Sequence, residues 1–392
     1  MSKGKIFLLV ALSVSSTTVL AAKERVVRVS NSVRVGHDDN IYASADKTRS
    51  GYVTDIVNIS GKLTFSSRTD MLLYWQPEVR YRFDAENPKL TTYQDVYARL
   101  NHAISQRTFV NISDHLRYQD QEAKDGVTVV SDQNYLENDL KGAVDYTINS
   151  VSQAKAGAGY EFRKWDDNTY GTVYGNDYDQ IRANGSYIRQ LRPNTAQGTL
   201  GFSYIDHSYE GSRGGFGLST IYGGVDHNFN PNLIGNISLG YSYVNIEDQN
   251  GADENTSRPD LQAGLGFNPT ARTSLTGSMG YSIYRAQNSY YNAQDRFNLA
   301  VGARHDLTSK ISISSSLRYI LGYYDSDYAK AGPGAEGDAE DSFVIFSLRA
   351  SYQINRNNFV DAGYSYSERT SDSWRLNEYD RNRVDIGWRL EL

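Results

Sequence analysis

Arginine and tyrosine are the side chains of this sequence with the clearest chemical potential, because both recur at alternate positions of extended segments. Between residues 71 and 83, for example, Tyr74, Glu78 and Arg80 alternate with apolar residues. A guanidinium group binds carboxylates, and an aromatic ring combines an apolar face with a polar tip. The pattern favours a surface that holds or conducts sugars and anions.

The sequence contains no recognisable set of catalytic residues. It has no G-x-S-x-G nucleophile elbow, and neither a Ser/His/Asp set nor a carboxylate pair can be assembled in one place. Gly332, Gly334 and Gly337 match a dinucleotide-binding spacing, but a proline lies among them and no helix is predicted to follow. We therefore expect no catalytic residues and no cofactor. A barrel enzyme stays the rival class, because catalytic geometry is not visible in a sequence.

Metal binding is also not predicted. The acidic segments 166–171 and 247–255 carry oxygens that suit Ca²⁺, but neither has the full twelve-residue ligand spacing, so solvated loops explain them better. His37, Asp38 and Asp39 are neighbours in a predicted turn, and the 6 histidines of the chain show no ligand spacing. The absence of cysteine excludes disulfides and thiolate zinc sites.

The elements that position the arginines and tyrosines are predicted to be β-strands. Apolar residues recur at every second position in about eighteen segments of roughly ten residues, from about Arg25 to the C-terminus. Segments 51–65 and 71–83 flank a short turn and predict a hairpin. Strands of this length and an even strand number suit a bacterial outer-membrane barrel. The predicted fold class is all-β: a transmembrane antiparallel up-and-down β-barrel of about eighteen strands.

Composition agrees with this fold class. There are 31 tyrosines and 33 glycines against 7 prolines, as many twisted, aromatic-rich strands require. The mean hydropathy of -0.57 leaves no room for a helical span of roughly 20 apolar residues in the mature chain. The net charge of -6 argues against a nucleic-acid partner.

The two ends of the chain carry separate signals. Residues 1–22 have lysines at positions 3 and 5, a short apolar run and small residues at 21 and 22, which predicts a secretory signal peptide followed by a barrel over 23–392.

At the other end, Asp385, Gly387, Leu390 and Leu392 match the spacing of a signal for the barrel insertion machinery, although Leu392 replaces the usual phenylalanine. Pairing of the last strand with the first would remove both sheet edges. A soluble sandwich is the alternative.

Short and long connections alternate along the chain. Segments 105–107, 192–194, 229–232, 268–272 and 355–357 are short, whereas 119–134, 245–257 and 325–341 are long. In outer-membrane barrels the short turns are periplasmic, which places the N-terminus inside and the GHDDNIY segment, residues 36–42, at the first outer loop. Two of the long loops, 119–134 and 325–341, have the length to fold in and narrow the pore.

Alternation also predicts which side chains face the lumen. The predicted pore-lining residues are mixed in charge with an excess of cations, and transverse ion pairs are expected to hold most of them. They are Arg28, Arg34, Tyr74, Glu78, Arg80, Arg82, Asp95, Tyr97, Arg99, Arg117, Arg163, Arg182, Tyr222, Tyr284, Arg304, Arg318, Arg349 and Arg383. Asp114 falls on the lipid-facing register between Ile112 and Leu116, which predicts a bulge or register change at that position.

The opening VRVGHDDNIY, the following GYVTDIVNISGKLTFSSRTDMLLYWQPEVRYRF and the repeated strand–turn–strand units resemble the putative β-barrel porin 2 family. The resemblance covers nearly the whole mature chain. It implies a large outer-membrane barrel similar to those encoded with exopolysaccharide assembly systems, which acts as the exit of the polymer with a periplasmic polysaccharide-export protein as docking partner. The family pattern supplies no catalytic residues.

Three functions remain open at this point. The first is a conduit for a secreted polysaccharide, which is acidic if the lumen arginines attract it. The second is a diffusion porin for small sugars or ions, and the third is a surface structural or adhesion barrel. In each case the expected surroundings are outer-membrane lipid and lipopolysaccharide. Barrel size does not decide among the three functions, because about eighteen strands are enough for an aqueous channel in all of them.

Overall fold

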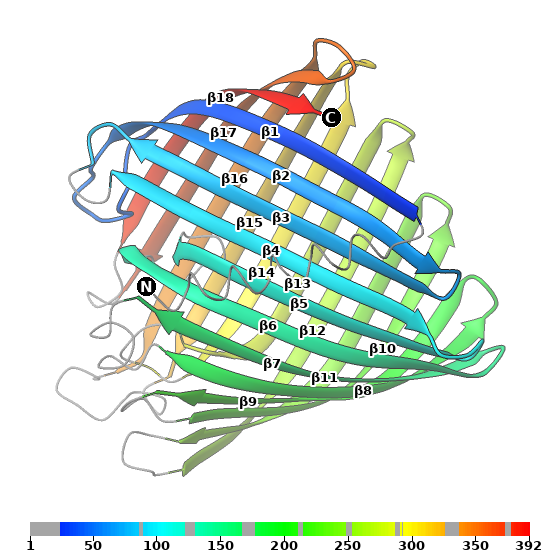
Figure 1. Cartoon of the computed structure of the whole chain (residues 1–392). Coiled ribbons are helices and arrows are strands. Elements are labelled where there is room, and N and C mark those ends of the chain that lie inside the picture. Colours follow the sequence, from blue (N-terminus) through cyan, green and yellow to red (C-terminus); the bar gives the residue numbers. More distant parts are fainter. Residues whose placement is uncertain are drawn as a thin grey trace.

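The computed structural model describes residues 24–85, 89–121, 130–166, 177–210, 215–247, 253–286, 291, 293–325, 337–372 and 378–392. These residues form eighteen antiparallel strands in one closed sheet (Figure 1), which confirms the predicted fold class. No helix within these ranges has the length and apolar character to cross a membrane. The predicted signal peptide, residues 1–22, lies outside the described residues.

Each strand pairs with its neighbours in chain order. The strands are β1 (Glu24–Asp38), β2 (Ser50–Ser66), β3 (Thr69–Arg82), β4 (Leu90–Ala103), β5 (Thr108–Gln121), β6 (Val130–Asn149), β7 (Ser152–Trp165), β8 (Tyr178–Arg192), β9 (Ala196–Tyr209), β10 (Gly215–Asn230), β11 (Leu233–Glu247), β12 (Asp253–Thr270), β13 (Thr273–Arg285), β14 (Ala293–Asp306), β15 (Ile311–Tyr324), β16 (Ala339–Gln353), β17 (Asn358–Ser371) and β18 (Tyr379–Glu391).

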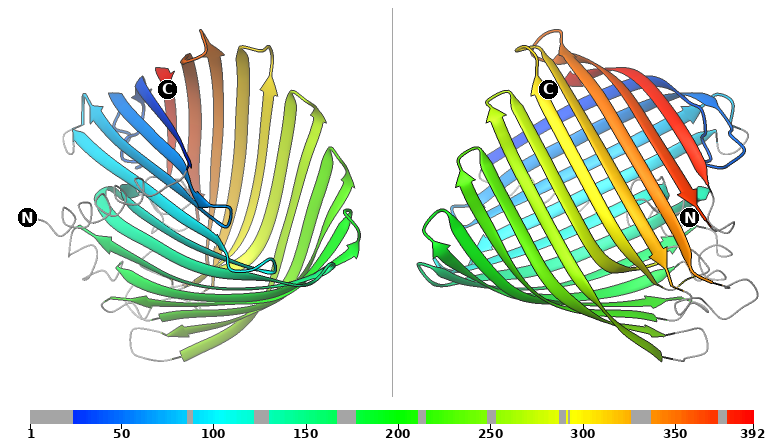
Figure 2. Two further views of the ribbon diagram at one scale, coloured as in Figure 1. Left: turned by 45° about the vertical axis from the view of Figure 1, so that its right-hand side comes forward. Right: turned by 180° about the vertical axis from the view of Figure 1, so that it is seen from behind.

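The barrel closes between its first and last strands. β1 pairs with β2 on one side and with β18 on the other, where the register runs from Ser30 opposite Glu391 to Asp38 opposite Arg383. Figure 2 shows the resulting continuous wall, with the C-terminal strand beside the first. Closure leaves neither of these strands as an open edge of the kind that promotes aggregation.

The strands are longer than the predicted ten residues. They contain 13 to 20 residues, because backbone pairing continues into segments whose sequences read as loops. β11 and β12, for example, pair as far as Glu247 opposite Asp253, inside the segment 245–257 that was predicted to be a loop. Polar residues in these extensions carry no apolar alternation, so the sequence pattern does not reveal them.

Short turns lie at one end of the barrel and longer connections at the other, as predicted (Figure 1). Ser66 Oγ accepts a hydrogen bond from the N–H of Arg68 at 3.1 Å, and Ser105 Oγ accepts one from the N–H of Arg107 at 3.1 Å. The same contact recurs in further short turns, at Asn149, Asn230, Thr270, Thr308 and Asn355. These side chains form local bonds to the backbone that end a strand, so their repetition explains the tight turns.

The outward face of the strands is apolar and exposed. Ile221, Leu200 and Leu239 have relative exposures of 69%, 63% and 61%. Leu200 of β9 and Leu239 of β11 both pair with the residue of β10 that lies two positions after Ile221, so the three side chains are close neighbours on the outer face. A continuous apolar outer surface on a closed sheet fits a lipid bilayer, where every backbone group must be paired internally.

Asp114 lies on this outer face without the predicted bulge. β5 pairs regularly on both sides there, with Asp114 opposite Ala98 of β4 and opposite Leu140 of β6. The prediction of a bulge or register change at Asp114 is therefore wrong. Asn138 Nδ2 donates a hydrogen bond to Asp114 Oδ1 at 2.6 Å, which gives the carboxylate a partner and lets the ladder continue unbroken.

Candidate functional site

The candidate site is the inner wall of the barrel. The eighteen predicted pore-lining residues all occupy positions opposite in phase to the apolar outer row; on β3 and β4, for example, Tyr74 faces Tyr97 while the next pair is Trp75 and Val96. Their backbone positions therefore lie on the inner face, from Arg28 and Arg34 on β1 to Arg383 on β18. Which of them a passing solute meets depends on the contacts that each makes.

On β5 to β7 the inner cations are tied to a buried carboxylate. Glu137 is only 1% exposed and lies between Arg117 and Arg163 in the register. Arg163 Nη2 donates to Glu137 Oε2 at 2.5 Å, and Arg117 contacts the other oxygen. The Arg163 guanidinium also lies 4.4 Å from the ring centroid of Tyr135 and 5.3 Å from that of Tyr178. The shared carboxylate holds both arginines in the wall, although Arg117 Nε has no hydrogen-bond partner.

A second paired group continues toward β8. Arg182 contacts Asp139 and lies 3.2 Å from Glu161, while Lys141 Nζ lies 2.6 Å from Asp139. These charged side chains come from the adjacent strands β6, β7 and β8, so their ion pairs link neighbouring strands across the wall. They match the expected transverse ion pairs.

The seam between β18 and β1 is paired in the same way. Asp385 lies 3.5 Å from Arg34 of β1 and 3.3 Å from Arg349 of β16. Asp38 accepts hydrogen bonds from Arg381 at 2.5 Å and from Arg383 at 2.9 Å.

The four residues that match the signal for the barrel insertion machinery lie on both faces of this seam. Gly387 lies on the inner face, where an added Cβ would come within 2.5 Å of Arg34 Cγ, so glycine makes room for the arginine that reaches Asp385. Leu390 and Leu392 belong to the outward phase, and Leu392 is 72% exposed. The structure therefore gives Asp385 and Gly387 a role in closing the wall.

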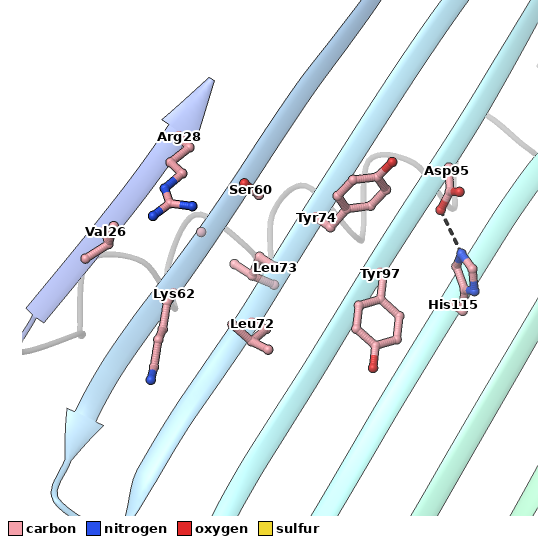
Figure 3. A pocket seen from close by; sticks show the side chains of 11 residues that line it. Val26, Arg28, Ser60, Lys62, Leu72, Leu73, Tyr74, Asp95, Tyr97 and His115 are labelled. Carbon is pink, nitrogen blue, oxygen red and sulfur yellow. Dashed lines mark hydrogen bonds and ion pairs between the residues drawn. The ribbon is translucent and has the colours of Figure 1, made fainter. Parts of the chain in front are cut away.

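The inner wall of β1 to β4 differs, because several of its cations lack a carboxylate. We call Arg28, Lys62, Tyr74, Tyr97 and Arg99 the unpaired basic face. Within the described ranges, Arg28, Lys62 and Arg99 form no ion pair, and Arg99 Nε has no hydrogen-bond partner. A cavity of about 710 Å³ is lined by Arg28, Lys62, Tyr74 and Tyr97 (Figure 3). At its edge, His115 Nε2 and Asp95 Oδ1 are 2.7 Å apart.

Farther along β3 the basic side chains are again held. Arg80 Nη2 donates to Glu78 Oε1 at 2.8 Å, and its guanidinium lies 5.8 Å from the Tyr52 ring centroid and 5.3 Å from that of Tyr93. Arg82 is 5% exposed. Neither arginine presents a free charge to the lumen as Lys62 does.

A second cavity of about 730 Å³ lies against the inner face of strands between β5 and β14. Tyr222 and Tyr284 line it, together with Arg117 and Arg163. The remaining predicted residues, Arg304 and Arg318, lie on β14 and β15, and Arg304 is 3.5 Å from Asp306.

The outer end of this cavity is formed by an element that the sequence did not predict. β12 pairs with β13 only up to Leu261 opposite Tyr281, whereas β13 continues to Arg285 beside β14. Beyond Tyr281 the strand separates from β12 while it stays paired with β14, and Ile283 packs in a buried cluster with Phe216 and Val244 of β10 and β11. Simple alternation would place Arg285 outside, so sequence reasoning missed it.

Arg285 reaches across the lumen as a result. Its guanidinium contacts His207 Nε2 and lies 4.5 Å from the Tyr178 ring centroid and 4.9 Å from that of Tyr209. These partners belong to β8 and β9, several strands away from β13. The contact joins two sides of the barrel and narrows its outer mouth.

The first outer connection, residues 39–49, also turns inward, and it begins within the GHDDNIY segment as predicted. Asn40, Ile41 and Ala43 are at most 5% exposed, and Ala43 packs with Ile320, Phe343 and Tyr379 on the inner wall. Asn40 Nδ2 donates to the carbonyl oxygen of Asp380 at 2.9 Å. Lys47 contacts Asp380, and this hydrogen bond raises the pKa of Lys47.

Other predicted features fall partly or wholly beyond the described ranges. The predicted loops 119–134, 166–171, 247–255 and 325–341 are largely in this class, as are Gly332 and Gly334. Within the part of the chain that the structure describes, no group of three His, Asp or Glu side chains is arranged to hold a metal ion.

Comparison with known proteins agrees with this architecture. Residues 213–392 match the model of the family described as Putative beta-barrel porin 2, consistent with the resemblance, although the match does not include the opening motif quoted above. No curated protein matches the chain.

Solved structures give the same fold. Pseudomonas aeruginosa OccK2 (OpdF) is similar at 10% identity with a TM-score of 0.52, covering 93% of this chain and 98% of its own. Pseudomonas aeruginosa OpdK with vanillate gives 9% identity and 0.52, covering 93% and 99%. The FrpB iron transporter of Neisseria meningitidis, F3-3 variant, gives 9% identity and 0.50, covering 96% and 83%. The chain has the fold of a porin-like outer-membrane β-barrel.

Proposed function

Starting from an outer-membrane barrel of porin-like architecture, we propose that this chain is the exit conduit for a secreted acidic exopolysaccharide. The observation that carries the proposal is the unpaired basic face, where Arg28, Lys62 and Arg99 line the lumen without carboxylate partners in the described residues. Free cations on a channel wall raise the local concentration of anionic solutes and speed their entry.

The position of this face supports transport from the periplasm outward. Lys62 and Arg99 each lie four residues before the end of a strand that leads into a short turn. Because short turns are periplasmic in bacterial barrels, the free cations stand at the entrance that a polymer leaving the periplasm meets first. Tyr74 and Tyr97 add aromatic surface at the same entrance.

The test compares the location of the polymer in a strain lacking this gene and in the same strain carrying the gene on a plasmid. We expect the deletion to reduce exopolysaccharide outside the cell and to increase it in the periplasm, and we expect the plasmid to restore release. An unchanged distribution would reject the conduit.

A periplasmic polysaccharide-export protein is the partner that we propose for the short-turn end. Exposed turn residues such as Arg68 and Arg107 are available there for a docking contact. Photo-crosslinking from position 68 or 107 in cells should capture a periplasmic protein, whereas the same probe at Lys47 of the outer connection should not. Equal capture from both ends would argue against a specific dock.

A small-solute porin is the second candidate, favoured by the narrowed outer mouth. Residues 39–49 and the end of β13 both occupy space inside the barrel, which restricts the size of a solute. OpdK has been solved with vanillate and OccK2 with glucuronate, both of them small acids. Liposome swelling with sugars of increasing size distinguishes the candidates, because a porin of this kind admits mono- and disaccharides and excludes a polymer.

A further inference from the structure

We propose that the unpaired basic face is a binding site for a carboxylated glycan segment, with the cations holding sugar carboxylates and the tyrosines contacting the rings. The inference rests on the proposed function and deepens it by assigning the carboxylates and the rings of the sugar to particular side chains. It is equally compatible with a porin for sugar acids, so its test is independent of export in cells.

The cations of this face are the first part of the argument. Arg28 and Lys62 are exposed to the lumen, while Arg99 is half-buried and keeps an unsatisfied Nε. Several other cations of the inner wall are bonded to acids, as Arg163 is to Glu137, so the missing carboxylate, and not the unsatisfied Nε that Arg117 and Arg182 share, distinguishes this face. Arg28, Lys62 and Arg99 outnumber Asp95, the acid that lines the cavity at this face, so the local charge is positive and attracts an anionic ligand.

The register brings these side chains onto one continuous strip. Arg28 faces Ser60, Ser60 faces Tyr74, and Tyr74 faces Tyr97 across four adjacent strands. Two residues closer to the short turns, Lys62 faces Leu72 and Leu72 faces Arg99. With neighbouring strands about 4.8 Å apart, the strip from β1 to β4 is about 14 Å wide.

This width indicates the kind of ligand. A strip of this width, with Arg28 on its β1 edge, Arg99 on its β4 edge and Tyr74 between them, is longer than one sugar ring, so it suits an oligosaccharide that carries several carboxylates. Tyr74 Oη donates to Gln76 Oε1 at 2.6 Å, and the Tyr97 ring makes an edge contact with His115 at 5.6 Å between centroids. These contacts hold both rings in fixed positions, which reduces the entropy lost on binding.

The cavity beside this strip is open to water and has a volume of about 710 Å³. Figure 3 shows Arg28 and Lys62 on one side of it and the two tyrosines on the other. Leu72 lies between them and supplies apolar surface. The combination of cations on one side with apolar and aromatic area beside them matches a sugar acid better than a simple ion.

The experiment measures block of the single-channel current in planar bilayers by three probes added on the short-turn side. The probes are trigalacturonate, maltotriose as its neutral counterpart of equal length, and monomeric galacturonate. We expect trigalacturonate to block at a concentration about ten-fold lower than either of the others, because its several carboxylates can each form a charge-assisted hydrogen bond that the neutral sugar lacks and the monomer forms only once. Equal block by trigalacturonate and maltotriose would overturn the proposal, and equal block by the monomer would reduce the ligand to a single sugar acid.

Two double variants locate the site. Arg28→Ser with Lys62→Ser should raise the blocking concentration of trigalacturonate about ten-fold. Lys141→Ser with Lys155→Ser is the matched control, since it removes two lumen cations that are paired with Asp139 and Asp145. The control should change block by less than about two-fold. The same loss in both variants would show that only the overall charge of the lumen matters.

A third variant tests the tyrosines without changing charge. Tyr74→Leu with Tyr97→Leu should weaken trigalacturonate block while leaving conductance of chloride close to the original. Folding of every variant is checked by the heat-dependent shift in gel mobility that closed barrels show. If a double variant does not fold, trigalacturonate block is measured instead in the single variants Lys62→Ser and Tyr97→Leu.

The outcomes separate this inference from the proposed function. Selective block together with unchanged polymer export in cells would leave a sugar-acid porin with this site. Lost export in the deletion strain together with no selective block would leave a conduit whose wall does not bind the polymer.

Discussion

The two inner walls of this barrel carry similar residues and differ in how those residues are paired. On β5 to β7, Glu137 is buried between Arg117 and Arg163, and all three side chains are fixed. On β1 to β4, Arg28, Lys62 and Arg99 project from the same face of the sheet without such a carboxylate in the described residues. An arginine on a pore wall is therefore structural or ligand-binding according to what stands opposite it on the next strand.

The largest effect is expected from removing the central acid of the paired wall. Glu137→Gln leaves Arg117 and Arg163 close together with only a neutral amide between them, and breaking a buried ion pair costs roughly 3 to 5 kcal/mol. Arg28→Ser on the unpaired face should change the free energy of unfolding by less than about 0.5 kcal/mol. Urea-induced unfolding of the folded barrel in lipid vesicles measures both. Similar losses in the two variants would remove the distinction between the walls.

A slightly smaller effect is expected when charge is moved from the inner face to the outer one. Leu239→Arg on the lipid side should cost roughly 2 to 4 kcal/mol near the bilayer midplane. Asn236→Arg, on the inner side of the same strand, should fold normally and shift ion selectivity toward anions. If the two variants lose equal stability, the assignment of faces fails.

A change in single-channel conductance is expected when the constriction at the outer mouth is removed. Arg285→Ala removes the contacts with His207, Tyr178 and Tyr209 that join the two sides of the barrel. We expect a higher and noisier single-channel current with little change in stability. Arg304→Ala, on β14 but at the turn end and paired with Asp306, serves as the control. An unchanged current would show that the β13 end does not limit flow.

The smallest effect is expected in ion selectivity. Arg28→Ser with Lys62→Ser should reduce the preference for anions, which appears as a shift of the reversal potential in a salt gradient. Screening by salt should make the shift larger at low ionic strength, since exposed charges are screened strongly. A shift that does not depend on salt would indicate an indirect change in pore shape.

The sequence was sufficient for the fold and for the phase of each strand. Strict alternation identified the eighteen strands and placed residues such as Tyr74 and Tyr97 on the inner face. The ends of strands were missed where pairing continues through polar residues, as in Glu247 opposite Asp253. Alternation reports which face a side chain takes, and pairing beyond the bilayer needs no apolar residues.

Ion pairing was less accessible to sequence reasoning. Whether an arginine meets an acid depends on the register of three strands, as for Glu137 between Arg117 and Arg163. Arg285 defeats even the alternation rule, because β13 departs from β12 after Tyr281. Asp114 was misread for a related reason: the hydrogen bond from Asn138 that lets it stay in register lies on another strand.

The contact of Asp385 with Arg34 has a consequence for biogenesis. Asp385 is on β18 and Arg34 is on β1, so this carboxylate acquires both of its cations only when these two strands meet. Joining residues so distant in sequence is an entropically costly step. The ion pair therefore forms only in a completed barrel. A chain that stops before β18 leaves the positive charge of Arg34 without this carboxylate, whereas the closed wall neutralises that charge.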